Sequence, residues 1–169
     1  YWNNSLGCIL DGEQLVFPLL EEGVTVLEIP VKQTEKAEHE ALIFKRQDAC
    51  HEVKFLDIEI EDGGSLLEVT QRPSRRIEVY GDSVSAGDVV EAVDYIGCED
   101  PEHNGEYSNG WYSYAWITAR KLNAQIHDVA QGGAALLDQT GWFHAPDYIG
   151  METIWDKIRY NPELGEMLK

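Results

Sequence analysis

The chain has 169 residues, of which 43% are hydrophobic and 10% aromatic, a composition that supports a buried core and argues against a disordered or fibrous protein. Its 31 acidic and 13 basic residues give a formal net charge of -18, and the only basic cluster is formed by Arg72, Arg75 and Arg76. This charge repels phosphate backbones and anionic membranes, which disfavours nucleic acid and membrane partners and favours a neutral ligand such as a sugar or an ester.

Targeting signals and cysteine usage are the features of the sequence that bear on its cellular location. No apolar run reaches the roughly 20 residues that span a bilayer, and the opening YWNNSLGCILDGEQ lacks the regions of a signal peptide. Cys8, Cys50 and Cys98 are odd in number and lack metal-ligand spacing, which argues against a disulfide framework or a zinc site. A cytoplasmic location is slightly favoured, while a segment upstream of Tyr1 would allow secretion. The sequence leaves open whether the chain forms a homo-oligomer.

Residues 15–70 have the pattern of an all-β domain. Short apolar runs, LVFPLL, VTVLEIPVK, ALIFKR and VKFLDIEIE, are separated by charged or glycine-bearing turns and predict four strands. In the second and fourth runs the apolar alternation shifts by one residue, which indicates bulged strands or strands that switch between the sheets of a sandwich. The polar, proline-containing segment 71–75 marks a domain boundary.

Beyond the boundary the pattern changes to strand, loop, helix and strand. Ile77 to Tyr80 predicts a strand, residues 109–122 predict a helix, and residues 124–130 predict a second strand. The helix would bury one face and begin at an N-cap, with Trp111, Ala115, Ala119 and Leu122 on that face and Ser108 or Asn109 as the cap. Such a unit implies a parallel sheet whose functional loops, here at Ser83 and Gly132, meet at the carboxyl ends of its strands.

The segment IEVYGDSVSAG raises the question of whether Ser83 is a nucleophile or a turn residue. A serine hydroxyl becomes a nucleophile when a base takes its proton and donors stabilise the oxyanion that it creates. Gly81 allows a sharp turn after the strand, and the Gly132-Gly133 turn could supply a second backbone amide. Gly-Asp-Ser taken alone is more typical of a turn that caps a helix than of a nucleophile.

The wider context carries a family resemblance. GDSVSAG after a strand resembles the first block of the SGNH (GDSL-type) hydrolases, and DGGSLLEVTQRPSRRIEVYGDS resembles the domain junction of carbohydrate esterase family 2, the acetylxylan esterases. The helix ending Ala119-Arg120 and the turn VAQGGA are similar to that family too. The resemblance implies an α/β SGNH-hydrolase domain with a flavodoxin-like parallel sheet over residues 77–169, preceded by an all-β jelly-roll sandwich domain over residues 1–72. Both domains would be incomplete.

The same resemblance implies a serine esterase that removes acetyl groups from xylan-type or other acetylated saccharides without a metal or organic cofactor. Ser83 would be the nucleophile and would place its own amide in the oxyanion hole, and the second glycine of that hole falls on Gly132 or Gly133. The family's Gly-x-Asn-Asp block and its carboxyl-terminal histidine block are not found in these residues. The resemblance therefore implies a fragment, with the catalytic histidine beyond Lys169.

The histidines in the chain offer no clear base. Asp100-Pro101-Glu102-His103 has the Asp-x-x-His spacing of the family's last block, but it follows the nucleophile by only twenty positions and lies in a polar loop. We interpret His103 as a decoy and His127 as a strand histidine satisfied by its neighbours. His39, His51 and His144 have no supporting constellation.

Aromatic residues near the two loops are candidates for sugar binding, namely Trp142, Trp111 and Tyr112. Trp142, flanked by Gly141 and by polar residues, is the preferred exposed candidate, whereas core packing is favoured for Trp111, Trp116 and Trp155. Asp88, Glu91 and Asp94 have helical spacing and predict a solvated helix face, with the lining of a polar pocket as the alternative. Two other functions fit the sequence: a non-catalytic carbohydrate-binding module and an acyltransferase of the same fold.

Overall fold

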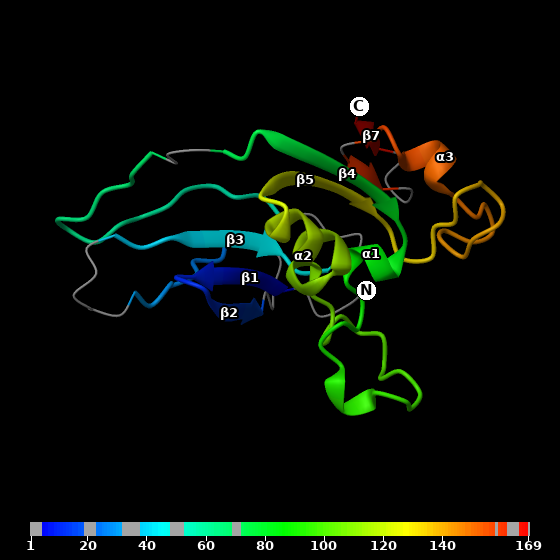
Figure 1. Cartoon of the computed structure of the whole chain (residues 1–169), viewed down its shortest axis with the longest axis horizontal. Helices are drawn as coiled ribbons and strands as arrows, with labels where there is room; N and C mark the ends of the chain where they lie inside the picture. The colour runs from blue at the N-terminus through cyan, green and yellow to red at the C-terminus, as the bar shows by residue number, and fades with distance from the viewer. Residues whose placement is uncertain are drawn as a thin grey trace.

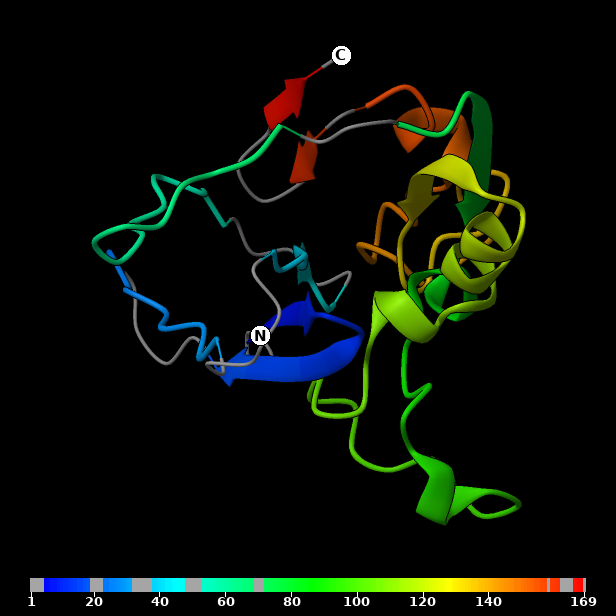
Figure 2. The same cartoon turned by 60° about the vertical axis from the view of Figure 1, so that its left-hand side comes forward.

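The computed structural model describes residues 5–18, 23–31, 38–47, 53–68, 72–157, 159–161 and 166–168. The described residues form an antiparallel sheet near the N-terminus and a parallel pair of strands. The segment that leads into helix α2 lies between them (Figure 1). A loop between residues 89 and 107 projects away from both sheets in both views (Figures 1 and 2).

The N-terminal sheet has the strand order β2-β1-β3, and both of its strand pairs are antiparallel. Its strands are β1 (Ser5–Leu10), β2 (Glu13–Pro18) and β3 (Ala41–Lys45). β2 and β3 confirm the strands predicted at LVFPLL and ALIFKR, although Leu19 and Leu20 lie outside the described residues. β1 was not predicted, although Asp11 (φ 52°) and Gly12 (φ 90°) form the two-residue turn that typically closes a hairpin.

The strands predicted at VTVLEIPVK and VKFLDIEIE are wrong for the part of each run that the structure describes. Residues 24–31 and 53–61 have no regular secondary structure, and most of their apolar side chains are exposed. An alternating run becomes a strand only when a neighbouring strand pairs with its N–H and C=O groups, and neither run has such a neighbour among the described residues. Both runs lie on the side of the molecule away from α2 (Figure 2). Because neither run forms a strand, the bulges predicted in them are wrong as well.

The α/β half confirms the predicted strand, helix and strand. β4 (Arg75–Gly81) and β5 (Ala124–Ala130) are parallel, with Gly81 opposite Ala130. The short helix α1 (Ser83–Ala86) follows β4, and helix α2 (Tyr114–Lys121) packs on β5 (Figure 1). The 3-10 helices η1 (Val93–Tyr95) and η2 (Gly110–Tyr112) lie in the connection between them.

The helix predicted at 109–122 is divided in two at Ser113. Asn109 caps η2, and Ser113, whose extended backbone interrupts the helical path, caps α2 through a hydrogen bond from Trp116 N to its Oγ. Ala115 and Ala119 are buried as predicted. Leu122 is 45% exposed because it follows the last helical residue and leaves the buried face.

The remaining described elements lie toward the C-terminal end. Helix α3 (Met151–Ile154) contributes Met151 and Ile154 to a small core with Ala134, against which Val129 of β5 packs. Strands β6 (Arg159–Asn161) and β7 (Glu166–Leu168) form an antiparallel pair. None of the helices in the described ranges has the length and apolar character required to cross a membrane.

Gly87 is the position where the backbone most clearly excludes a side chain. It ends α1 with a φ of +85°, and a Cβ there would lie 2.5 Å from the carbonyl oxygen of Asn109. Gly97 has a similar φ of +79° but no atom within 4 Å of such a Cβ. We expect Gly97→Ala to lower the free energy of unfolding by about 1–2 kcal/mol through backbone strain, and Gly87→Ala by roughly 1–3 kcal/mol more through overpacking. Urea unfolding followed by tryptophan fluorescence measures both losses, and equal losses would contradict the close approach.

Candidate active site

Ser83 lies where β4 ends and α1 begins. It is the first residue of α1 and is half-buried. The N-cap is Asp82, whose Oδ1 accepts a hydrogen bond from Val84 N at 3.0 Å. The Ser83 hydroxyl makes no hydrogen bond to any described residue. The local structure therefore uses Asp82 as the cap and leaves the Ser83 hydroxyl without a structural role.

Gly81 is needed for packing, which differs from the predicted reason of a sharp turn. Its backbone does not have a positive φ. A Cβ on Gly81 would lie 2.0 Å from Ser85 Oγ, and that hydroxyl is 2.7 Å from Tyr114 Oη on α2. The absence of a side chain at Gly81 thus lets α1 lie directly against the end of β4.

The Gly132-Gly133 turn follows β5, next to the end of β4. Gln131 N donates a hydrogen bond to Gly81 O at 3.1 Å, which joins the carboxyl ends of the two strands and confirms that their loops are neighbours. Gly133 has a φ of +80°, and its carbonyl oxygen accepts hydrogen bonds from Trp142 N at 2.7 Å and Phe143 N at 3.0 Å. These contacts hold the Trp142 loop on the turn.

Two of the four tryptophans in the described residues are exposed. Trp142 is 85% exposed, as predicted. Trp155 is 54% exposed, so its predicted place in the core is wrong; it follows α3, whose buried residues are Met151 and Ile154.

The other aromatic candidates lie where the N-terminal sheet meets the α/β half. Trp111 is partly buried, stacks on Phe44 of β3 with ring centroids 5.9 Å apart, and carries the Arg120 guanidinium 3.7 Å from its ring centroid. Trp116 lies 6.3 Å from Trp111 and extends this stack. Tyr112 is exposed. Packing is therefore the observed role of Trp111 and Trp116.

The described histidines face carboxylates and not Ser83. His103, the decoy, lies with Nδ1 3.2 Å from Asp88 Oδ2 and Nε2 3.7 Å from Asp100 Oδ2. The other three pairs are His127 with Glu78 at 4.0 Å, His39 with Asp11 at 2.6 Å and His144 with Asp147 at 3.6 Å. His51 lies outside the described residues. None of the four described histidines hydrogen-bonds Ser83.

The predicted solvated helix of Asp88, Glu91 and Asp94 is wrong. Residues 87–91 form a turn, and of the three carboxylates only Asp94 lies in a helix, the 3-10 helix η1. Asp88 accepts a hydrogen bond from Ser108 Oγ at 2.6 Å, and Glu91 accepts one from Gln14 Nε2 at 3.1 Å and pairs with Arg46. These carboxylates therefore bind the loop after α1 to other parts of the chain.

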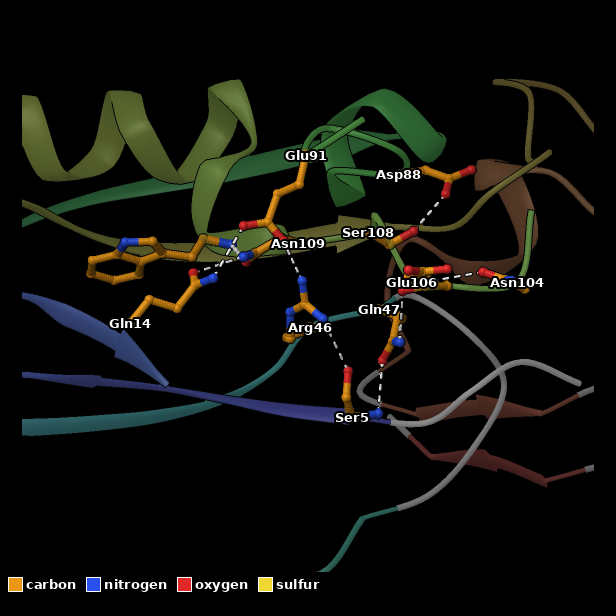
Figure 3. A network of polar contacts seen from close by, with 12 residues as sticks. Ser5, Gln14, Arg46, Gln47, Asp88, Glu91, Asn104, Glu106, Ser108 and Asn109 are labelled. Atoms are coloured by element: carbon orange, nitrogen blue, oxygen red, sulfur yellow. Dashed lines mark hydrogen bonds and ion pairs between the residues drawn. The ribbon is translucent and has the colours of Figure 1, made fainter. Parts of the chain in front are cut away.

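A polar network joins this loop to the N-terminal sheet (Figure 3). Arg46, 6% exposed, donates through Nη1 to Ser5 Oγ at 3.3 Å and through Nη2 to Glu91. Gln47 accepts from Ser5 N at 3.2 Å and donates to Gly105 O at 3.0 Å. We call the set Ser5, Gln14, Arg46, Gln47, Glu91 and Asn109 the junction network. The sequence carries no local signal for it, because its members come from segments up to 95 positions apart.

Asp128 of β5 carries the largest electrostatic perturbation near the strand ends. Burial raises the pKa of its carboxyl from 3.8 to about 6, against a smaller lowering effect of His127. Within the described ranges, its Oδ1 is buried without a hydrogen-bond partner, as is Arg46 Nε.

Burial also raises the pKa of the Cys8 thiol. Cys8 and Cys98 are free thiols, and Cys50 lies outside the described residues. No group of three or more His, Cys, Asp or Glu in the described segments is arranged to hold a metal ion.

Comparison with known proteins identifies relatives of the chain. Residues 1–69 match the family model Carbohydrate esterase 2 N-terminal. The chain is 33% identical over 138 residues to an acetylxylan esterase / glucomannan deacetylase of Cellvibrio japonicus, covering 75% of this chain and 37% of that protein. It is 28% identical over 172 residues to the cellulase/esterase CelE of Acetivibrio thermocellus, covering 95% of this chain and 20% of that protein.

Solved structures show the same fold. A family two carbohydrate esterase from Clostridium thermocellum, in complex with cellohexaose, superposes with a TM-score of 0.71 at 23% identity, covering 99% of this chain and 49% of that one. The fold of this chain therefore corresponds to about half of that of a family 2 carbohydrate esterase. The chain is a relative of these esterases, as its sequence indicates, and it spans well under half of the curated relatives' length.

The raised pKa of Asp128 makes the stability of the fold depend on pH. The folded state holds the proton of Asp128 more tightly than the unfolded chain does. The protonated carboxyl therefore stabilises the fold fully below pH 3.8, and this stabilisation is lost as the pH rises through about 6. We expect Asp128→Asn, which stays neutral, to raise the free energy of unfolding by roughly 1–3 kcal/mol at about pH 7.5 and to change it little at about pH 4.

Urea unfolding at the two pH values measures this difference. Asp100→Asn, at an exposed carboxylate, serves as the control and should shift stability little at either pH. An equal effect of Asp128→Asn at both pH values would show that folding does not shift the pKa of this carboxyl.

Proposed function

We propose that the protein containing this chain is a serine esterase that removes acetyl groups from xylan-type or other acetylated saccharides, with Ser83 as its nucleophile. The observation that carries the proposal is the place of Ser83, at the carboxyl end of a parallel strand beside a glycine turn, with a hydroxyl that no described residue engages. The relatives named acetylxylan esterase and the bound cellohexaose of the structural neighbour support a saccharide ester as the substrate.

The proposed reaction has two steps. Ser83 Oγ attacks the carbonyl carbon of the acetyl group and its proton passes to the base. The bond from that carbon to the sugar oxygen then breaks as the sugar oxygen takes this proton from the base and leaves as a hydroxyl. Water then cleaves the acetyl-serine ester, which releases acetate and restores the hydroxyl. The residue that acts as base is not assigned among the described histidines. No cofactor takes part in these steps.

An oxyanion hole is proposed from backbone amides at the two strand ends. Ser83 N supplies one donor, and Gly132 N, or Gly133 N one residue further, supplies the second. The hydrogen bond from Gln131 N to Gly81 O supports this pairing, because it keeps the two loops next to one another. Loss of one such donor typically costs about 3 kcal/mol of transition-state stabilisation.

Trp142 is the proposed platform for the sugar. The residue is 85% exposed while its backbone amide is bonded to Gly133 O, so the loop holds an exposed aromatic side chain beside the proposed hole. Tyr112, exposed on η2, is a second candidate. Trp111 is the weakest of the three because its ring is engaged by Phe44 and Arg120.

We also propose the division of the chain into a jelly-roll domain over residues 1–72 and an SGNH-hydrolase domain with a flavodoxin-like sheet over residues 77–169. The antiparallel N-terminal sheet and the parallel pairing of β4 with β5 support it. Each half would be part of a larger domain of that kind.

Replacement of the nucleophile tests the proposed reaction. We expect Ser83→Ala to lower the rate of acetate release from acetylated xylo-oligosaccharide by at least about 10³-fold, because no other group then forms the acyl intermediate. Ser74→Ala, at an exposed serine before β4, is the control and should retain full activity. Turnover that Ser83→Ala leaves unchanged would reject the mechanism.

The same assay separates the other two functions. Saccharide binding without acetate release by the unsubstituted protein would identify a carbohydrate-binding module. Acetyl groups recovered on a second saccharide in place of free acetate would identify an acyltransferase.

A further inference from the structure

We propose that Asn109 is a positioning residue for Ser83, and that through Asn109 the N-terminal sheet becomes part of the active site. The inference rests on the proposed role of Ser83 as nucleophile. It arises from a continuous path of hydrogen bonds that starts at the Ser83 backbone and ends on β2.

The first step of the path fixes the carbonyl of Ser83. Gly87 N and Asp88 N both donate to Ser83 O, the latter at 2.9 Å. Because α1 has only one turn, its orientation depends on these bonds, on those of Asp82 and on the hydrogen bond between Ser85 and Tyr114. The turn at 87–88 is therefore one of the constraints on how Ser83 is presented.

The second step fixes that turn against Asn109. Asn109 N donates to Gly87 O at 2.9 Å, and the Asn109 carbonyl oxygen lies where a Cβ of Gly87 would stand. Asn109 is 0% exposed, so it cannot contact a substrate. Its effect on Ser83 is exerted through the turn, which makes it a positioning residue and not a catalytic one.

The third step joins Asn109 to the sheet (Figure 3). Its Nδ2 donates to Gln14 Oε1 of β2 at 2.9 Å, and its Oδ1 accepts from Trp111 N at 3.1 Å. Gln14 Nε2 in turn donates to Glu91 Oε1, and Glu91 pairs with Arg46. The position uses a donor and an acceptor on two separate atoms of one short side chain, which Asn supplies; an ionised Asp has no donor, and Ser carries both functions on a single oxygen.

Contacts on the far side of Asn109 keep the same segment against the sheet. Gly110 N donates to Arg46 O at 2.9 Å, and the Trp111 ring stacks on Phe44 of β3. The sheet therefore holds Asn109 from β2 and from the end of β3, and Asn109 holds the turn that follows Ser83. Loosening the sheet contact is expected to loosen the α1 turn even though β2 lies about 70 positions away in the chain.

Hydrogen exchange measured by mass spectrometry tests the inference without relying on activity. In Asn109→Ala and in Gln14→Met, we expect the amides of residues 86–88 to exchange about tenfold faster, as expected when about one net hydrogen bond is lost, while the paired amides of β1 and β2 keep their protection. Gln125→Met is the matched control, because Gln125 also makes a partly buried side-chain hydrogen bond, to Pro73 O, but at the opposite end of the parallel strands. It should leave residues 86–88 unchanged.

Unchanged exchange at residues 86–88 in both variants, or acceleration spread equally over β1 and β2, would overturn the inference. If Asn109→Ala does not fold, Gln14→Met decides alone. In the acetate-release assay the two variants should lower kcat about tenfold with little change in KM, because the substrate contacts are untouched. If the unsubstituted protein releases no acetate, the proposed function fails while the exchange result still decides whether Asn109 positions α1.

Discussion

The ion pair between Arg46 and Glu91 is the constraint on which the rest of the structure depends. Arg46 stands directly after β3 and is 6% exposed, and a buried guanidinium is costly unless a carboxylate and hydrogen-bond acceptors surround it. Glu91 supplies the carboxylate from the loop after α1, and Ser5 Oγ accepts a further hydrogen bond. The loop cannot move away from the sheet without leaving a buried charge unpaired.

This ion pair helps to hold the N-terminal sheet against the α/β half. Apart from Cys8 of β1, the largest fully buried side chains of the described structure are the polar Asn109, Ser108 and Ser113, and Asn109 joins the two halves beside the Phe44–Trp111 stack. Such groups are stable only when each is bonded, which fixes their relative positions more narrowly than apolar packing would. The junction network therefore holds the turn after α1, the helix that begins at Ser83, in one position relative to the sheet.

The elements that local patterns specify were predictable, whereas contacts between distant residues were not. β4 and β5 are apolar strands bounded by glycine and polar turns, and both lie where the sequence predicts them. Residues 24–31 and 53–61 alternate as strands do, but they would need a neighbouring strand to pair with. None of the described residues pairs with them, and no strand forms. The capping preference of Asn109 was visible, but the division of the helix at Ser113, whose extended backbone starts α2 at a second N-cap, was not predicted. The hairpin at Asp11-Gly12 had a readable signal in its two turn residues.

A double-mutant cycle between Arg46 and Glu91 tests the central claim most directly. The free energies of urea unfolding of Arg46→Met, Glu91→Gln and the double variant give the coupling between the end of β3 and the loop after α1. If the buried pair joins the sheet to the loop, the coupling is at least about 1 kcal/mol, and the double variant is more stable than the sum of the single losses predicts. A coupling within about 0.3 kcal/mol of zero would show that the two halves are held independently of this pair.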